Sequence, residues 1–371
     1  MDADDNNYLR RLRETETPLL EYLRTFEVIQ ENLRLGAVTQ SQERLLQATG
    51  DTFRRFAPFA ELQPPVHLSE FHLKFREAVA LLEHSLTLFL TRANPQWTLA
   101  FLNSRAHFCQ ALYLLYEIRK ELPRLGQYFV IEGVSCPADA VTDGTRTTNV
   151  PLGFTHRERN DKRGDYTLYV PENYSTASRW PLIICLHGGY GQGREYIFTW
   201  LRPARCKGYI LLSPKSLVHT WTMTMRSPDT TSILRMIEEV TAEYNIDRSR
   251  IFLTGLSDGG IFTYILGLEH HSMFAGIAPV AGALHLMIQP ILSQGAGRDL
   301  PIYVIHGVHD FIFPVQLTRQ TCTMLRELGY NLRYDELPEW GHAYPYSINE
   351  RMVMPWFEQL PPTPRQAPDN P

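Results

Sequence analysis

Short apolar runs alternate with amphipathic stretches along the second half of the chain. The runs are bounded by turn residues and are typical of buried parallel strands; they predict strands near 165–170, 182–187, 209–213, 250–255, 275–280, 301–306 and 331–337. The stretches between them have helical spacing and predict helices near 193–204, 229–244, 259–268, 315–328 and 348–358. Strands that alternate with helices favour a mostly parallel sheet with right-handed crossovers.

The segment before residue 125 has helical spacing throughout. Its apolar stripes predict four amphipathic helices, near 19–33, 39–56, 69–90 and 99–118, with Asn94-Pro95 and Pro123 ending the last two. Short connections favour an up-and-down bundle, or a helical layer on the rest of the chain. The stripes are explained by core packing. The alternatives are a cap over a site, or a surface for a partner or a second copy of the chain.

These patterns predict an α/β fold with a mostly parallel central sheet, preceded by an all-α domain. The expected boundaries are a four-helix domain at 1–125, a linker and edge hairpin at 126–165, and the α/β domain at 166–360. Within the linker, Tyr128 to Ile131 could form a strand. The proline-rich tail at 361–371 is expected to be loose.

A serine between glycines follows the predicted strand at 250–255. The segment Gly255-Leu256-Ser257-Asp258-Gly259 precedes a predicted helix, and strand, sharp turn and helix make the setting of a nucleophile elbow. Glycine and serine are common enough for the bare pattern to arise by chance, so it needs partners. Asp310 and His342 follow two later predicted strands. A hydroxyl needs an imidazole to accept its proton and a carboxylate to orient that imidazole, so we expect a Ser257, Asp310 and His342 triad.

A glycine-rich loop follows the predicted strand at 182–187. Backbone N–H groups must stabilise the oxyanion of a tetrahedral intermediate. One donor is expected to be the amide of Asp258, directly after the nucleophile. The other is expected to be Gly189, with Tyr190 as the second choice.

The remaining histidines favour structural roles. His187, His306 and His309 lie beside glycine turns at strand ends, where a histidine commonly binds loop backbone. The pair His270-His271 is expected to be a solvated helix end, since no acid or histidine stands at the spacing of a helix-borne metal site. The sequence predicts neither a metal nor a cofactor.

Taken together, four segments resemble the phospholipase/carboxylesterase group of α/β-hydrolases, near acyl-protein thioesterases and feruloyl-esterase-like enzymes. They are Leu186-His187-Gly188-Gly189, Gly255 to Gly260, His306 to Asp310 with Pro314-Val315, and Trp340-Gly341-His342. The resemblance covers roughly residues 165 to 360. It implies hydrolysis of carboxylic esters or thioesters by Ser257, Asp310 and His342 without a cofactor, with oxyanion donors at Gly189 and Asp258.

Asp258 departs from thioesterase-like relatives, which often carry glutamine there, and its charge would disfavour anionic substrates. Prolyl-oligopeptidase-like peptidases share the motif set, so a peptidase or amidase is the alternative. A non-catalytic hydrolase-like binding protein is a third reading, disfavoured because all three catalytic residue types are present.

The substrate is expected to be a small-molecule or lipid-like ester. Residues 257 to 310 leave little room for an inserted lid, so the site would admit bulky groups. The side chains expected to contact substrate are Tyr190, Trp221, Met223, Met225, Trp340 and Tyr344.

Composition narrows the possible partners. The net charge of −4 disfavours nucleic acid and anionic membranes, and no apolar run reaches the ~18 residues of a membrane span. The acidic, polar start resembles no signal peptide. Five scattered cysteines suggest reduced thiols, so we expect a cytoplasmic protein, with homo-oligomers through the helical domain as a further possibility.

Overall fold

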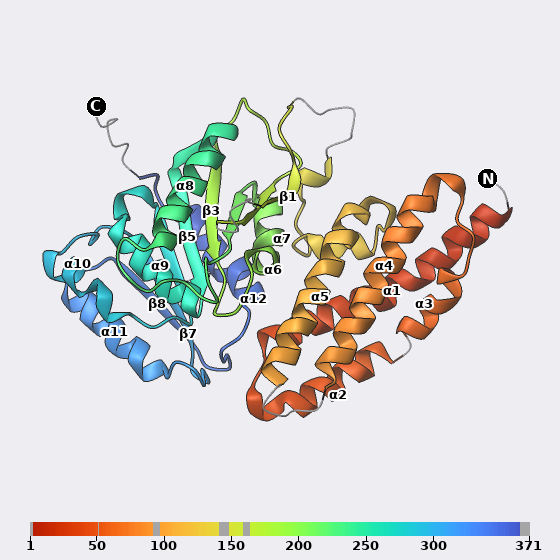
Figure 1. The fold of residues 1–371 in the computed structure, drawn as a ribbon, viewed down its shortest axis with the longest axis horizontal. Helices are drawn as coiled ribbons and strands as arrows, with labels where there is room; N and C mark the ends of the chain where they lie inside the picture. The colour runs from red at the N-terminus through yellow and green to blue at the C-terminus, as the bar shows by residue number, and fades with distance from the viewer. Residues whose placement is uncertain (1–2, 51, 92–96, 141–147, 159–163, 364–371) are drawn as a thin grey trace. The chain divides into compact units, whose positions relative to one another are not determined.

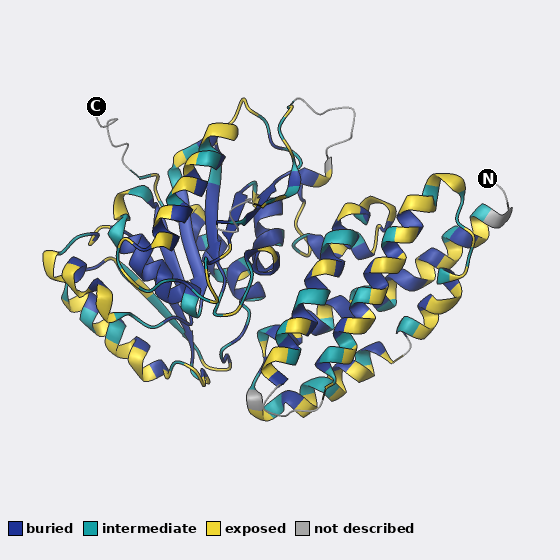
Figure 2. Ribbon diagram, viewed as in Figure 1, coloured by how far each residue is buried: buried dark blue, intermediate teal, exposed yellow. Residues whose placement is uncertain are grey.

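The N-terminal part of the chain forms helices and the later part forms a sheet with helices, as the apolar spacing predicts (Figure 1). This computed structural model describes residues 3–50, 52–91, 97–140, 148–158 and 164–363. Contacts divide the chain into two units, Met1–Gly133 and Val134–Pro371. Each unit buries a core of its own, seen as the dark segments of Figure 2. The predicted ends at Asn94-Pro95 and the tail from 364 onward lie outside the described residues.

All the elements of secondary structure in the described part of the first unit are helices. Its elements are α1 (Ala3–Glu31), η1 (Leu35–Ala37), α2 (Val38–Thr49), α3 (Thr52–Ala60), η2 (Val66–Leu68), α4 (Ser69–Phe89), α5 (Trp97–Glu117), η3 (Arg119–Glu121) and η4 (Leu125–Phe129). Phe26 of α1 meets Phe89 of α4 and Phe108 of α5, with ring centroids 5.2 and 5.0 Å apart. The apolar stripes therefore form the core of this unit.

The prediction of one helix at 39–56 is wrong. α2 ends at Thr49 and α3 begins at Thr52, so the described part of the unit has five α-helices in place of four. Gly50 follows α2, and glycine is about 1 kcal/mol less favourable than alanine inside a helix. The apolar spacing continues across the break, which hid it from pattern analysis.

The predicted strand at Tyr128 to Ile131 is also wrong. Tyr128 and Phe129 are buried in the 3-10 helix η4. The ring of Phe129 packs edge-on against Tyr116 at 5.1 Å, and the Tyr128 hydroxyl donates to the buried Glu27 carboxylate at 2.7 Å. Strand propensity describes packing on a sheet surface, and the partners here are helices.

The second unit contains a sheet of eight strands: β1 (Gly153–Arg157), β2 (Tyr166–Val170), β3 (Trp180–Leu186), β4 (Ile210–Pro214), β5 (Ile246–Leu256), β6 (Gly276–Val280), β7 (Ile302–Gly307) and β8 (Leu332–Leu337). Their order is β1-β2-β4-β3-β5-β6-β7-β8. β2 pairs antiparallel with β1 and β4, and the other pairs are parallel. The mostly parallel α/β sheet is thus confirmed, and β1 and β2 pair at one edge of it.

Helices precede, connect and follow these strands. They are η5 (Pro137–Ala140), α6 (Gly193–Tyr196), α7 (Phe198–Lys207), α8 (Pro228–Glu243), α9 (Asp258–Glu269), η7 (His271–Met273), η8 (Leu286–Ile288), α10 (Gln289–Gln294), α11 (Val315–Glu327), α12 (Tyr346–Ile348), a π-helical turn η9 (Asn349–Val353) and α13 (Met354–Gln359). The predicted helix at 193–204 divides at Ile197, and the one at 348–358 contains the π turn. The helices predicted at 229–244, 259–268 and 315–328 agree within a few residues. In the first unit, the helix predicted near 19–33 begins much earlier, at Ala3.

Alternate residues of the central strand β5 face the two helical layers. Phe252 stacks on Phe357 of α13 at 4.4 Å, and Phe357 stacks on Trp200 of α7 at 5.9 Å. Its neighbour Leu253 belongs to the core cluster that includes Ile237 of α8. β5 is therefore covered on both faces, which explains its continuous apolar run.

Two details concern the ends and surface of the chain. Thr363 is attached to the fold, because its amide donates to the Ser249 carbonyl at 2.9 Å, so the first residues of the predicted loose tail are tethered. Within the described residues, every helix is too short or too polar to cross a bilayer.

Candidate active site

Ser257 occupies a strained turn between β5 and α9. Its φ of 58° and ψ of −121° lie in a region that residues other than glycine rarely adopt. A Cβ on Gly255 would stand 2.4 Å from the Gly259 carbonyl oxygen, and one on Gly259 would stand 2.3 Å from that of Leu186. Both glycines are therefore required by close backbone approach. The turn has the geometry of a nucleophile elbow at the carboxyl end of the central strand.

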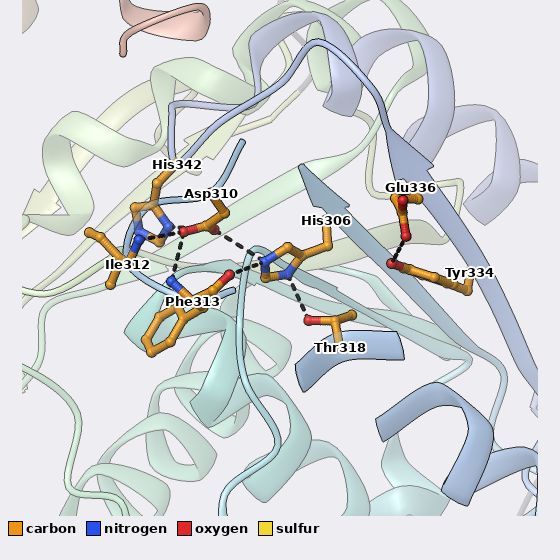
Figure 3. Close-up of polar contacts among 8 residues, drawn as sticks. All are labelled: His306, Asp310, Ile312, Phe313, Thr318, Tyr334, Glu336 and His342. Atoms are coloured by element: carbon orange, nitrogen blue, oxygen red, sulfur yellow. Dashed lines mark hydrogen bonds and ion pairs between the residues drawn. The ribbon is translucent and has the colours of Figure 1, made fainter. Parts of the chain in front are cut away.

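Asp310 and His342 are joined directly. Asp310 follows β7, His342 follows β8, and His342 Nδ1 lies 2.8 Å from Asp310 Oδ2 (Figure 3). Because an ionised carboxylate only accepts, Nδ1 carries the proton and Nε2 is the basic nitrogen of the neutral ring. The sheet brings these two residues to the edge where Ser257 lies, since parallel strands β5, β7 and β8 end there.

The Asp310 carboxylate is held by its own loop. Oδ1 accepts from the amides of Ile312 and Phe313 at 2.8 Å each. His306 Nε2 lies 3.3 Å from Oδ2, while it donates to the Phe313 carbonyl at 2.8 Å and Thr318 bonds its Nδ1 at 3.0 Å (Figure 3). His306 is fully buried and binds loop backbone, as a structural histidine would.

These contacts keep Asp310 ionised. Burial raises its pKa, but hydrogen bonds from His306 and His342 lower it more strongly, so the pKa of Asp310 lies well below its usual range. A permanently charged carboxylate favours the Nδ1–H tautomer of His342 and would stabilise its imidazolium.

The Ser257 hydroxyl has no hydrogen-bonding partner among the described residues. Catalytic hydrogen bonds are often long in the absence of substrate and tighten in the complex. The pairing of Ser257 with His342 therefore stays a prediction, based on their shared edge of the sheet.

The two expected oxyanion donors border the elbow. Within the described residues, neither the Gly189 amide nor the Asp258 amide makes a hydrogen bond, so both N–H groups are available. The prediction of the Tyr190 amide as the second-choice donor is wrong. Its amide donates to the His219 carbonyl at 2.7 Å, so this N–H is already engaged. The Tyr190 ring is 72% exposed and stacks on the His219 ring.

His187 supports the glycine loop from beneath. Its Nδ1 donates to the Gly188 carbonyl at 2.7 Å and its Nε2 accepts from the Ser216 amide at 3.1 Å. Trp221 donates from Nε1 to the His187 carbonyl at 2.7 Å. His187 is buried, and burial lowers its pKa to about 4. It is a neutral structural residue, in line with the expectation from the sequence.

This burial predicts a loss of stability in mild acid. The unfolded chain binds the His187 proton below its ordinary pKa of 6.5, whereas the folded chain binds it only near 4. Stability from this residue is complete above pH 6.5, and about 3 kcal/mol is lost as the pH falls through this window. Urea unfolding at pH 7 and pH 5, followed by tryptophan fluorescence, measures the change. His187→Gln keeps both hydrogen-bonding atoms without the titration and should flatten the difference; an equal pH dependence in that variant would contradict the assignment.

The expected substrate-contacting residues divide into two groups. Tyr190 is exposed, and Tyr344 and Met223 are half-buried. Trp221 is 2% exposed, stacks on Phe262 at 5.4 Å and lies beneath its loop, where it packs in the core.

Trp340 and Met225 also differ from expectation. Trp340 is buried, and a Cβ on Gly307 would stand 2.3 Å from its carbonyl oxygen, so it packs against the end of β7. Met225 lines a surface pocket with His270 and His271, at the end of α9 opposite Ser257. A helix of 12 residues is about 18 Å long, so Met225 cannot contact a substrate at the elbow.

Two positioning residues were not found from the sequence. The buried Asp229 accepts from the Leu217 and Thr222 amides at 2.9 Å each, which fixes the loop after β4. Thr220 in that loop donates to Asp258. Asp229 follows Ser227-Pro228, a helix start, so its sequence context indicates only a capping role.

The described residues hold no cluster of three or more histidines, cysteines or acids with the spacing of a metal site. His270 and His271 lie at the end of α9, half-buried and exposed respectively. The arrangement at the sheet edge consists of a serine, a histidine, a carboxylate and two backbone amides.

Comparison with known proteins shows which family this unit resembles. The family model described as phospholipase/carboxylesterase matches residues 223–354, which include Ser257, Asp310 and His342. Over these residues the chain is similar to the phospholipase/carboxylesterase family. The eight-stranded sheet of the second unit, with the elbow after β5, is the α/β-hydrolase fold that the family resemblance implies.

Three curated proteins similar to this chain are named as esterases or a thioesterase. A bifunctional acetylxylan esterase/xylanase from Neocallimastix patriciarum is 30% identical over 41% of this chain and 22% of its own length. A probable feruloyl esterase C from Aspergillus terreus is 28% identical over 44% of this chain and 60% of its own. Acyl-protein thioesterase 1 from Gibberella zeae is 32% identical over 30% of this chain and 49% of its own. The alignments thus span less than two thirds of each relative.

Proposed function

We propose that the second unit is a serine hydrolase of carboxylic esters. The observation that carries the proposal is the Asp310–His342 hydrogen bond at 2.8 Å, beside an elbow serine at the same sheet edge. The locked, charged carboxylate supports His342 as a base and Ser257 as the nucleophile. Esterase and thioesterase relatives agree with this chemistry.

The reaction would proceed through an acyl-enzyme. Ser257 Oγ attacks the ester carbonyl carbon as His342 Nε2 takes its proton, and the oxyanion accepts from the amides of Gly189 and Asp258. The intermediate collapses, the carbon–oxygen bond to the alcohol breaks, and His342 returns the proton to the departing alcohol. Water then attacks the acyl carbon, again giving a proton to His342, and the carboxylic acid leaves with Ser257 restored.

Exposed apolar side chains support a small-molecule or lipid-like substrate. They project from loops that follow β3, β4, β6 and β7, at the edge where Ser257 lies: Tyr190, Val218, Leu286, Met287, Phe311 and Ile312. Phe311 and Phe313 also place rings 6.1 and 5.8 Å from the His342 ring. An apolar rim around the nucleophile would accept an acyl or aromatic group. A cytoplasmic location and homo-oligomers through the helical unit stay predictions.

A substrate panel separates the candidate functions. We expect wild type to react with a fluorophosphonate and to give higher kcat/KM on p-nitrophenyl acetate, butyrate and octanoate than on aminoacyl p-nitroanilides. Faster turnover of the anilides would replace the esterase by a peptidase or amidase. An unlabelled wild type without turnover would leave a hydrolase-like binding protein.

A further inference from the structure

The Asp258 carboxylate lies at the meeting point of three segments. It begins α9 directly after the nucleophile, and its Oδ2 accepts from Thr220 Oγ1 at 2.5 Å. A Cβ on Gly189 would stand 2.6 Å from the same Oδ2. The carboxylate thus contacts the glycine loop after β3 and the loop after β4 at once.

The loop after β4 is rigid enough to hold it. Residues 216–222, here called the supporting loop, are fixed at Leu217 and Thr222 by the buried Asp229 and at Ser216 by His187. A further tie runs from the Tyr190 amide to the His219 carbonyl at 2.7 Å. Thr220 is therefore a fixed donor for Asp258, placed between two anchored ends of its loop.

A carboxylate at this place is electrostatically unfavourable for the chemistry. The amide of the same residue is the expected donor to the oxyanion, and a negative charge nearby raises the energy of that anion. The N-terminus of α9 offsets part of this effect by favouring an acidic residue in the first turn. The contacts of this acid, with Thr220 and with the glycine loop, suggest a role other than stabilising the anion.

We propose that Asp258 is a positioning residue for the proposed esterase. Held by Thr220, its carboxylate seats the Gly189 backbone so that the Gly189 and Asp258 amides point to one place, that of the oxyanion. A side chain at position 189 would displace the carboxylate, because its Cβ would stand 2.6 Å from Asp258 Oδ2. This inference rests on the proposed function, since it concerns the same oxyanion.

Four single variants and one double variant test the link. Asp258→Ala and Thr220→Val each remove it, and each is expected to lower kcat by about 100-fold with little change in KM, because a misplaced donor acts on the transition state. The double variant should be no slower than the slower single variant, since both changes break one interaction. Asp258→Asn keeps an oxygen for Thr220 and Thr220→Ser keeps the donor, so both should retain kcat within a few-fold of wild type.

The outcomes distinguish this inference from the proposed function. Wild type that hydrolyses no ester overturns both. Active wild type with Asp258→Ala equally active, or with single-variant losses that multiply in the double variant, overturns the positioning role alone. A lower urea midpoint in Asp258→Ala with unchanged kcat shows a structural role only and also overturns it. The exposed Asp299→Asn is the matched control and should change neither kcat nor the midpoint.

Discussion

Ser257→Ala is expected to lower kcat on p-nitrophenyl butyrate by about 10⁶-fold and to abolish fluorophosphonate labelling. The variant removes the hydroxyl of the residue that occupies the strained elbow at the end of β5. The fold should persist, since the hydroxyl makes no hydrogen bond to any described residue. Initial-rate kinetics and gel detection of the labelled protein measure both effects.

The matched control is an exposed serine. Ser293 lies on α10 with its hydroxyl bonded only to the Pro290 carbonyl, so Ser293→Ala should keep wild-type labelling and turnover. Equal labelling of wild type and Ser257→Ala would show that another residue reacts, and would remove Ser257 as the nucleophile.

Asp310→Asn is expected to lower kcat by about 10⁴-fold with little change in KM. An amide at 310 would lose the charge that holds His342 in its Nδ1–H tautomer and stabilises the imidazolium. Because the pKa of Asp310 lies well below its usual range, the wild-type carboxylate remains charged throughout the assay range. Steady-state kinetics between pH 5 and pH 9 provide the measurement.

Asp299→Asn again serves as the control and should behave as wild type. Asp310→Asn at wild-type kcat would show that His342 needs no carboxylate, and the triad assignment would fail. A fall in activity that matched a loss of folded protein in urea unfolding would assign Asp310 a purely structural role.

The fold could be predicted because local pattern and tertiary environment agree over most of the chain. The continuous apolar run of β5 is buried on both faces, as the packing of Phe252 and Leu253 shows. The prediction was wrong where tertiary packing, and not local propensity, determined the secondary structure. Tyr128 and Phe129 have high strand propensity, but they pack among helices and form a 3-10 turn.

Sequence analysis could predict only those parts of the site that have a recognisable motif. Strained turns need glycine, so the elbow around Ser257 left a clear signal. Asp310 and His342 could be placed because parallel strands end at one edge. The hydrogen bond between Thr220 and Asp258 could not be predicted. The two residues are 38 positions apart in the sequence, and only the folded chain brings them together. The prediction that Met225 contacts substrate was wrong for a related reason. The loop that carries Met225 runs along α9 away from Ser257, and the sequence does not show the path of a loop.

The five cysteines give the protein a surface without native thiols. All five are buried, and burial raises the pKa of Cys322 to about 11 and that of Cys185 further, so little reactive thiolate forms at neutral pH. A cysteine introduced at the exposed Val218 would therefore be the preferred attachment point for a maleimide dye. Fluorescence anisotropy of that dye would show whether the supporting loop stays rigid while substrate turns over.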